Sequence, residues 1–109
     1  MILSLAVHGG AGSPPPGTLD VESEARRRSG IQRALDAGMA VLRSGGAAVD
    51  ATVAAVVALE ADPVFNAGRG SVYAADRTQR MDASVMDGQT GRAGAVCDCL
   101  LYTSDAADE

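Results

Sequence analysis

The residues of this chain best suited to chemistry lie in one short loop, residues 63–70, and at the end of the helix expected before it. Apolar spacing from Val49 to Leu59 predicts a helix, and Pro63 should end it because proline cannot continue the hydrogen-bond ladder. The last helical carbonyls, around Leu59 and Glu60, then lack helical partners, and the helix dipole makes that end partly negative. Hard cations prefer oxygen ligands, so these free carbonyls could form a cation site. The alternative is that the loop is an ordinary solvated turn.

Three residues of this loop favour a tight backbone curl. Asn66, Gly68 and Gly70 all tolerate positive φ angles, so the backbone can turn back toward the end of the helix. The segment that follows carries a repeated turn signal, Met81-Asp82-Ala83 and then Met86-Asp87-Gly88. We therefore expect the curl to lead into short strands.

A second candidate site is His8-Gly9-Gly10-Ala11-Gly12, which follows a short apolar run. A similar loop forms the oxyanion site of lipase-like hydrolases, but the G-x-S-x-G sequence of that fold is absent here. A general base also needs a nucleophile partner, and His8 has no identifiable one, so we expect His8 to order the loop by binding backbone. Gly9, Gly10 and Gly12 could form an anion nest, but they match neither the Rossmann fingerprint nor the P-loop.

The elements before the loop should act as its support. The apolar run Ile2 to Val7 predicts a buried strand. Asp20 is a suitable N-cap, and Glu22 and Glu24 suit the first turn of a helix. The apolar spacing that follows predicts that this helix continues to Ser44.

Gly45-Gly46 should end the first helix, and a second helix should run from about Ala47 to Asp62. This second helix is nearly all small and apolar, so we expect it to be buried against a sheet or another helix. A short connection between two helices predicts a helical hairpin.

Short strands are expected after the loop. Alternation and turn residues predict strands at Ser71–Ala74, at Arg80–Met86 and from Ala93 to Val96, with turns at 76–79 and 87–88.

Composition limits the class of protein. The 109 residues suffice for one domain, with 9 basic against 14 acidic residues and a net charge of −5. That balance argues against nucleic acid and anionic membranes as partners. The sequence has neither a signal-peptide pattern nor 18 consecutive apolar residues, so we expect a cytoplasmic protein. The basic run Arg26–Arg28 is interpreted as a solvated helix face, and Cys97 and Cys99 as incidental thiols.

Several motifs, in order, resemble the plant-type L-asparaginase / isoaspartyl peptidase family. They are His8 to Gly12, Gly45 to Ala51, Ala58 to Pro63, Phe65 to Val72, Met81 to Gly88 and Ala93 to Val96. The resemblance covers about Leu3 to Val96 and only the N-terminal part of the family's chain. It implies an α+β fold that is an incomplete N-terminal part of a four-layer αββα Ntn-hydrolase sandwich.

The resemblance divides the chain at residue 96. Residues 1–96 would be the N-terminal (alpha-subunit) part of the domain, and residues 97–109 would be a tail outside the family pattern. The segment from Cys99 to Glu109, CLLYTSDAADE, resembles read-through of a sequencing adapter.

The function implied is that of an amidohydrolase acting on L-asparagine, on isoaspartyl peptides or on both. Such precursors cut themselves before a threonine, which then serves as nucleophile. That threonine lies beyond this chain, so we expect the chain alone to be inactive. The implied partners are the missing C-terminal (beta-subunit) half, a small-molecule or dipeptide substrate, and further copies of the αβ unit.

The resemblance also assigns roles to loop residues. It implies no organic cofactor but a structural sodium ion, and Asn66 would lie near the nucleophile. The sodium would be bound by the backbone carbonyls of Leu59, Glu60, Asp62, Phe65, Ala67 and Arg69. The residues expected to shape the structural loops are His8, Gly9, Gly10, Gly12, Gly68 and Gly70. Arg80 receives no role.

Two alternatives remain. A hydrolase of the glycosylasparaginase branch would share the fold and the threonine chemistry. A non-catalytic cation-binding or interaction domain would be favoured if 109 residues were the whole product.

Overall fold

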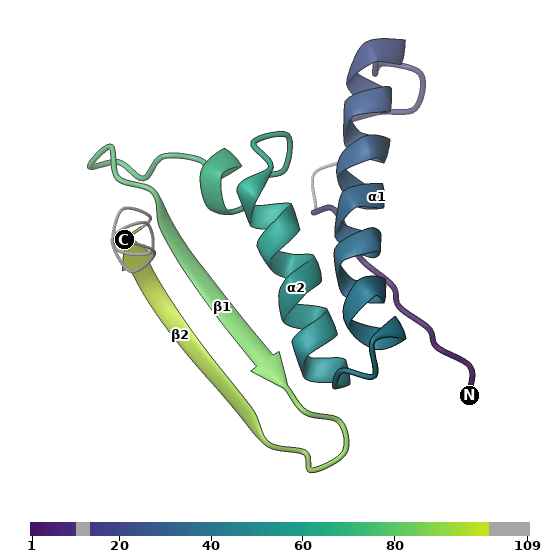
Figure 1. Ribbon diagram of the computed structural model, residues 1–109. Helices are drawn as coiled ribbons and strands as arrows, with labels where there is room; N and C mark the ends of the chain where they lie inside the picture. The colour runs from purple at the N-terminus through teal and green to yellow at the C-terminus, as the bar shows by residue number, and fades with distance from the viewer. Residues whose placement is uncertain (11–13, 101–109) are drawn as a thin grey trace.

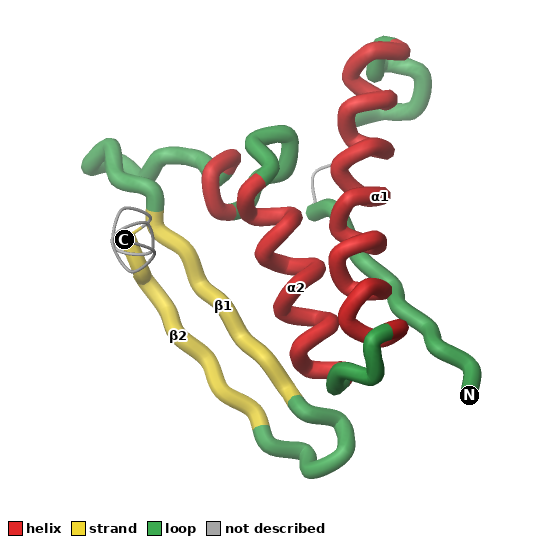
Figure 2. Tube along the Cα trace, viewed as in Figure 1, coloured by secondary structure: helices red, strands yellow, loops and turns green. Residues whose placement is uncertain are grey.

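A computed structural model of the chain describes residues 1–10 and 14–100, and it is an α+β arrangement (Figure 1). Its elements are α1 (Val21–Arg43), α2 (Ala48–Ala61), the 3-10 turn η1 (Gly68–Gly70), β1 (Arg80–Met86) and β2 (Ala93–Leu100). Helix α2 lies between α1 on one side and the β1–β2 hairpin on the other (Figure 2). Both helices and the last two strands confirm the sequence-based predictions.

Local signals explain α1. Asp20 is its N-cap, and Asp20 Oδ1 accepts a hydrogen bond of 2.7 Å from the Ser23 amide. Glu22 and Glu24 lie in the first turn and Arg43 in the last, where their charges complement the helix dipole. The expected cap and start of this helix are therefore confirmed.

The two helices pack through small residues. The buried positions of α1 are Gly30, Ala34 and Gly38, one every fourth residue. Gly38 faces α2, since a Cβ there would lie 3.0 Å from Ala51 O and 3.4 Å from Ala55 Cβ, whereas Gly30 faces the loop after α2. The buried residues of α2 are Ala51 and Ala55. Small side chains let the helix backbones approach closely, so the stripe that matters on α1 is one of small residues rather than large apolar ones.

Helix α2 packs against α1 as expected, but only Ala51 and Ala55 among its residues are buried. Its outer side exposes Val53, Val56 and Val57, at 47%, 42% and 59%. The β1–β2 hairpin lies on this side but only partly covers it, since Val85 and Val96 opposite are 40% and 57% exposed.

Two expected strands are also absent. Residues 2–7 are extended but pair with no other strand among the described residues, and Ile2 is 93% exposed. Residues 71–74 lead into a turn, in which the Ala74 amide donates to Thr78 O at 2.7 Å. A strand needs a hydrogen-bonding neighbour, and no strand of the described chain offers one to either segment.

The hairpin is antiparallel, with Arg80 opposite Leu100 and Met86 opposite Ala93. The expected turn at 87–88 is present, and Gly91 adopts φ +74 at its end. A bulge interrupts the register near Asp98, which has φ +56 and whose amide donates to Asp82 Oδ1. Of the expected tail, residues 101–109 lie outside the described residues, as does Gly12.

Candidate functional site

The loop after α2 forms around the end of that helix. Helix α2 ends at Ala61, as Pro63 predicted, and Asp62 takes an extended conformation as C-cap. The Asp62 amide donates to Leu59 O at 3.3 Å, and the Phe65 amide donates to Asp62 O at 3.3 Å. These two short-range bonds start the curl.

Two glycines let the loop fold back onto the helix end. Gly68 has φ +55, and a Cβ there would overlap the carbonyl oxygen of Glu60. A Cβ at Gly70 would overlap the carbonyl oxygen of Phe65 and lie 2.6 Å from that of Pro63. Glycine is thus needed at both positions because backbone approaches backbone.

Asn66 does not use the left-handed conformation that its residue type allows. It is absent from the residues with positive φ, and its Oδ1 instead accepts a hydrogen bond of 3.1 Å from the Val72 amide. Gly70 also lacks a positive φ, so space rather than backbone angle explains it. Of the three residues predicted to tolerate that conformation, only Gly68 adopts it.

The six carbonyls that the family resemblance implied as cation ligands belong to the last turn of α2 and to the loop that follows it. Four of them already accept one hydrogen bond each: Leu59, Asp62 and Ala67 from backbone amides, and Arg69 from Gln79 Nε2 at 3.3 Å. A carbonyl oxygen has two lone pairs, so each can still bind an ion. Neutral carbonyl oxygens at the negative end of a helix are the type of ligand that hard cations prefer.

Side chains that could bind a metal ion do not cluster in the described part of the chain. Across residues 1–10 and 14–100, no group of three or more His, Cys, Asp or Glu side chains is close enough to bind one metal ion. The described thiols, Cys97 and Cys99, are free.

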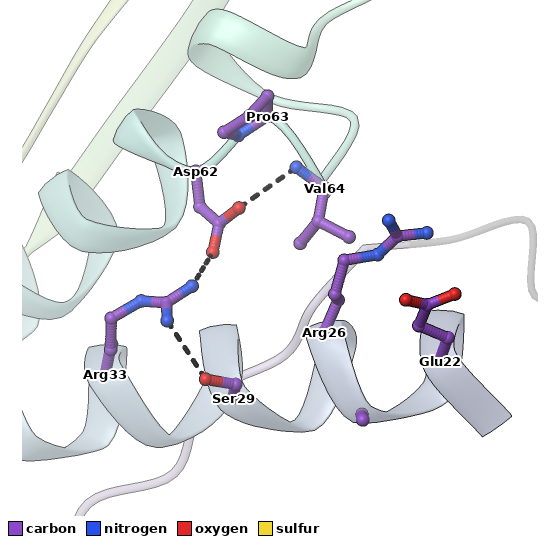
Figure 3. Close-up of a pocket in the computed structure, with 8 residues that line it drawn as sticks. Glu22, Arg26, Ser29, Arg33, Asp62, Pro63 and Val64 are labelled. Carbon is purple, nitrogen blue, oxygen red and sulfur yellow. Dashed lines mark hydrogen bonds and ion pairs between the residues drawn. The ribbon is translucent and has the colours of Figure 1, made fainter.

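Asp62 links the loop to α1 (Figure 3). Its Oδ2 lies 2.5 Å from Arg33 Nη2, and its Oδ1 accepts from the Val64 amide at 3.1 Å. The amide of Val64 and the guanidinium of Arg33 lower the pKa of Asp62 below its ordinary value of 3.8, although desolvation opposes them. The carboxylate is therefore ionised at neutral pH.

Sequence reasoning missed Arg33, to which it assigned no role. The two partners are 29 residues apart in the chain, and no local pattern joins them. Arg33 and Asp62 flank an open cleft of about 590 Å³ between α1 and residues 62–64, which Glu22, Arg26 and Ser29 also line (Figure 3).

The N-terminal loop reaches the same region. His8 Nδ1 accepts a hydrogen bond of 3.2 Å from the Gly10 amide, and Gly10 has φ +107. A Cβ at Gly9 would lie 3.0 Å from both Ile31 Cδ1 and Phe65 Cε1. The structure thus brings the start of the chain, α1 and the loop together around the ring of Phe65, which is 5% exposed.

Arg80 and Asn66 lie on another side of the loop. Both line a cleft of about 230 Å³ together with Glu60, Ser71 and Asp82. Arg80 Nη1 lies 3.0 Å from Asp98 and Nη2 lies 3.3 Å from Asp76, so Arg80 ties the start of β1 to the turn before it and to β2.

No helix in the described part of the chain is both long and apolar enough to cross a membrane.

Comparison with known proteins gives a consistent result. The family model described as asparaginase matches residues 1–101. The chain is 49% identical over 92 residues to isoaspartyl peptidase/L-asparaginase of Macaca fascicularis, and the matched stretch covers 84% of this chain and 29% of that protein. It is 44% identical over 92 residues to isoaspartyl peptidase of Salmonella typhimurium, with the same coverage. It is 50% identical over 97 residues to plant-type L-asparaginase of Pyrobaculum calidifontis, covering 85% of this chain and 30% of that protein. The chain therefore spans about three tenths of the length of these relatives.

Proposed function

This chain belongs to the asparaginase family, and we propose that it forms the N-terminal part of an amidohydrolase acting on L-asparagine, isoaspartyl peptides or both. The observation that carries the proposal is identity of 44% to 50% to proteins of those names over more than four fifths of the chain. The relatives' names include the isoaspartyl peptidases, which favours that branch over the glycosylasparaginases.

The proposed reaction uses a threonine that a self-cleaving precursor exposes beyond residue 109. Its free α-amine, with a pKa of about 8, accepts the hydroxyl proton as the oxygen attacks the substrate's side-chain carbonyl. Attack gives a tetrahedral oxyanion, and its collapse to an ester breaks the C–N bond while the protonated α-amine gives its proton to the leaving ammonia or peptide amine. Water then hydrolyses the ester, which releases aspartate and restores the threonine hydroxyl. The nucleophile belongs to the other part of the precursor, so the role of residues 1–109 is to support that site.

We assign the loop after α2 to a structural sodium ion. Its proposed ligands are the carbonyl oxygens of Leu59, Glu60, Asp62, Phe65, Ala67 and Arg69. A bound cation supplies positive charge where the helix dipole and these carbonyls concentrate negative charge. The loop that it stabilises also contains Asn66, our candidate for supporting the nucleophile.

The exposed apolar side of α2 supports the proposal of a larger assembly. Val53, Val56 and Val57 line an open groove of about 350 Å³ whose far wall includes Val85 and Val96. Contiguous apolar surface of this kind indicates an interface. We propose that the C-terminal half of the precursor covers it and completes the four-layer sandwich, and that the resulting αβ units pair.

The test expresses the complete product of the gene and, separately, residues 1–109. The complete product should hydrolyse β-aspartyl-leucine or L-asparagine and should contain a fragment whose first residue, by Edman sequencing, is threonine. Residues 1–109 alone should release neither aspartate nor ammonia.

Three results would contradict parts of the proposal. Hydrolysis by residues 1–109 alone would show that the chain has its own nucleophile. A complete product that neither cleaves itself nor hydrolyses either substrate would favour a non-catalytic cation-binding domain. Preference for a glycosylated asparagine would move the protein to the sister branch.

A further inference from the structure

The loop after α2 packs against one position of α1, around Gly30 and Arg33. Gly30 and Arg33, nearly one turn apart, lie on the same face of that helix. At Gly30 the loop meets the helix backbone directly, since a Cβ there would lie 2.7 Å from both Asp62 Oδ2 and Phe65 Cε2. Glycine at this position thus leaves room for two loop side chains.

Arg33 holds one of those side chains through a chain of hydrogen bonds (Figure 3). Its Nη1 donates to Ser29 Oγ at 3.0 Å, and its Nη2 donates to Asp62 Oδ2 at 2.5 Å. The other oxygen of Asp62 accepts from the Val64 amide. Both ends of the guanidinium and both oxygens of the carboxylate are therefore engaged.

The ion pair joins an exposed and a protected partner. The side chain of Arg33 is 61% exposed and that of Asp62 is 13% exposed. Solvent around Arg33 screens the attraction, so such a pair adds little to global stability. Its main consequence is geometric, because it joins α1 to a loop 29 residues further along the chain.

Asp62 and Phe65, which meet α1, also provide two of the six carbonyls proposed as cation ligands. Side-chain anchoring restricts the backbone of each residue, and with it the position of each carbonyl oxygen. From the other side, the close approaches at Gly68 and Gly70 fix the loop against Glu60 and Phe65. A cation that needs several oxygens at once would bind more tightly to a loop held from both sides.

We propose that Gly30 and Arg33 form a docking site on α1 that positions the loop carbonyls of Asp62 and Phe65 and thereby sets the loop's affinity for a monovalent cation. This inference depends on the cation site that the proposed function assigns to the loop. Arg33 is a positioning residue, which contacts neither substrate nor ion.

The test measures the Na⁺ dependence of thermal unfolding in the complete gene product, with choline chloride keeping the ionic strength constant. Arg33→Ala should raise the Na⁺ concentration at half effect by about tenfold or more, the loss typical when support of a metal ligand is removed. Arg33→Lys, which keeps the charge, should recover part of that loss.

Arg28→Ala is the matched control. Arg28 lies on the same helix and forms an ion pair of 2.9 Å with Glu24, but it does not touch the loop. Its removal should leave the Na⁺ dependence unchanged. Hydrogen exchange at the Val64 amide provides a second readout, since this amide should exchange faster in Arg33→Ala and not in Arg28→Ala.

The outcomes separate the two proposals. If the unaltered protein responds to Na⁺ and Arg33→Ala responds at the same concentration, the docking site is overturned while the cation loop stands. If the unaltered protein shows no specific response to Na⁺ over choline, the cation loop itself is wrong, and the docking proposal fails with it.

Discussion

The ring of Phe65 lies against the bare Cα of Gly30, so that a Cβ added to Gly30 would be 2.7 Å from Cε2 and 2.8 Å from Cζ of the ring. This contact seats the loop after α2 on α1. Gly30 is buried, and Phe65 is the one large side chain in the buried apolar core of the described residues. The packing of the loop therefore depends on a residue that has no side chain.

Gly30→Ala should destabilise the protein by a net amount of up to about 2 kcal/mol. Alanine improves helix propensity by about 1 kcal/mol, but overpacking a tight contact costs about 1–3 kcal/mol, and both Phe65 and Asp62 would have to move. Urea unfolding would measure the difference. Gly88→Ala, which has nothing within 4 Å of its added Cβ, should change stability by less than about 0.5 kcal/mol. Equal effects at both positions would contradict the packing argument.

Phe65→Ala should cost about 3–5 kcal/mol, as is usual for removing a buried aromatic side chain. Its ring contacts the region of Gly9 and Gly30 together, so its loss would leave a cavity between three segments. Phe65→Leu should cost less because it refills part of that space. Chemical denaturation of both variants would check this order, and an alanine variant as stable as the leucine variant would refute it.

Gly70→Ala should lower the free energy of unfolding by more than about 2 kcal/mol, which is a larger loss than that expected for Gly30→Ala. The added Cβ would meet the carbonyls of Phe65 and Pro63, which are backbone groups that cannot rotate away. The Na⁺ dependence of unfolding should disappear in the same variant. A Gly70→Ala protein of normal stability and normal Na⁺ response would show that the loop has another conformation.

Asp20→Ala should lower the melting temperature at neutral pH, because the Ser23 amide loses the carboxylate oxygen that accepts its hydrogen bond. Hydrogen bonds from the backbone amide and side chain of Ser23 lower the pKa of Asp20 from 3.8. A carboxyl with a lowered folded-state pKa stabilises the protein above its unfolded pKa of 3.8, and that contribution is lost as the pH falls through the folded value.

Asp20→Asn is the matched control for the cap. Asparagine also caps helices but does not titrate, so this variant should stay close to the unaltered protein at pH 7 and should lack the Asp20 contribution to acid sensitivity. Melting curves at pH 7 and pH 3 would distinguish the variants. An alanine variant that melts like the unaltered protein at pH 7 would contradict the capping role.

The helices and the hairpin were predictable because their signals are local. The cap at Asp20 and the proline at position 63 mark the bounds of helices whose backbone hydrogen bonds form between residues close in sequence. The turn at Asp87 likewise lies between two strands that pair with each other. The strands predicted at 2–7 and 71–74 fail for the opposite reason, since each would need a partner strand that the described chain does not supply.

The sequence by itself determined the family, through ordered motifs around Asn66 and Asp82, and it located the loop that ends α2. Only the tertiary structure revealed that Arg33 and Gly30 receive this loop, and that Asn66 caps the Val72 amide instead of adopting a left-handed turn. The physical reason is the distance along the sequence between the interacting residues. Caps and turns depend on neighbours within a few residues, whereas an ion pair across 29 residues exists only after two helices have packed through their glycines and alanines.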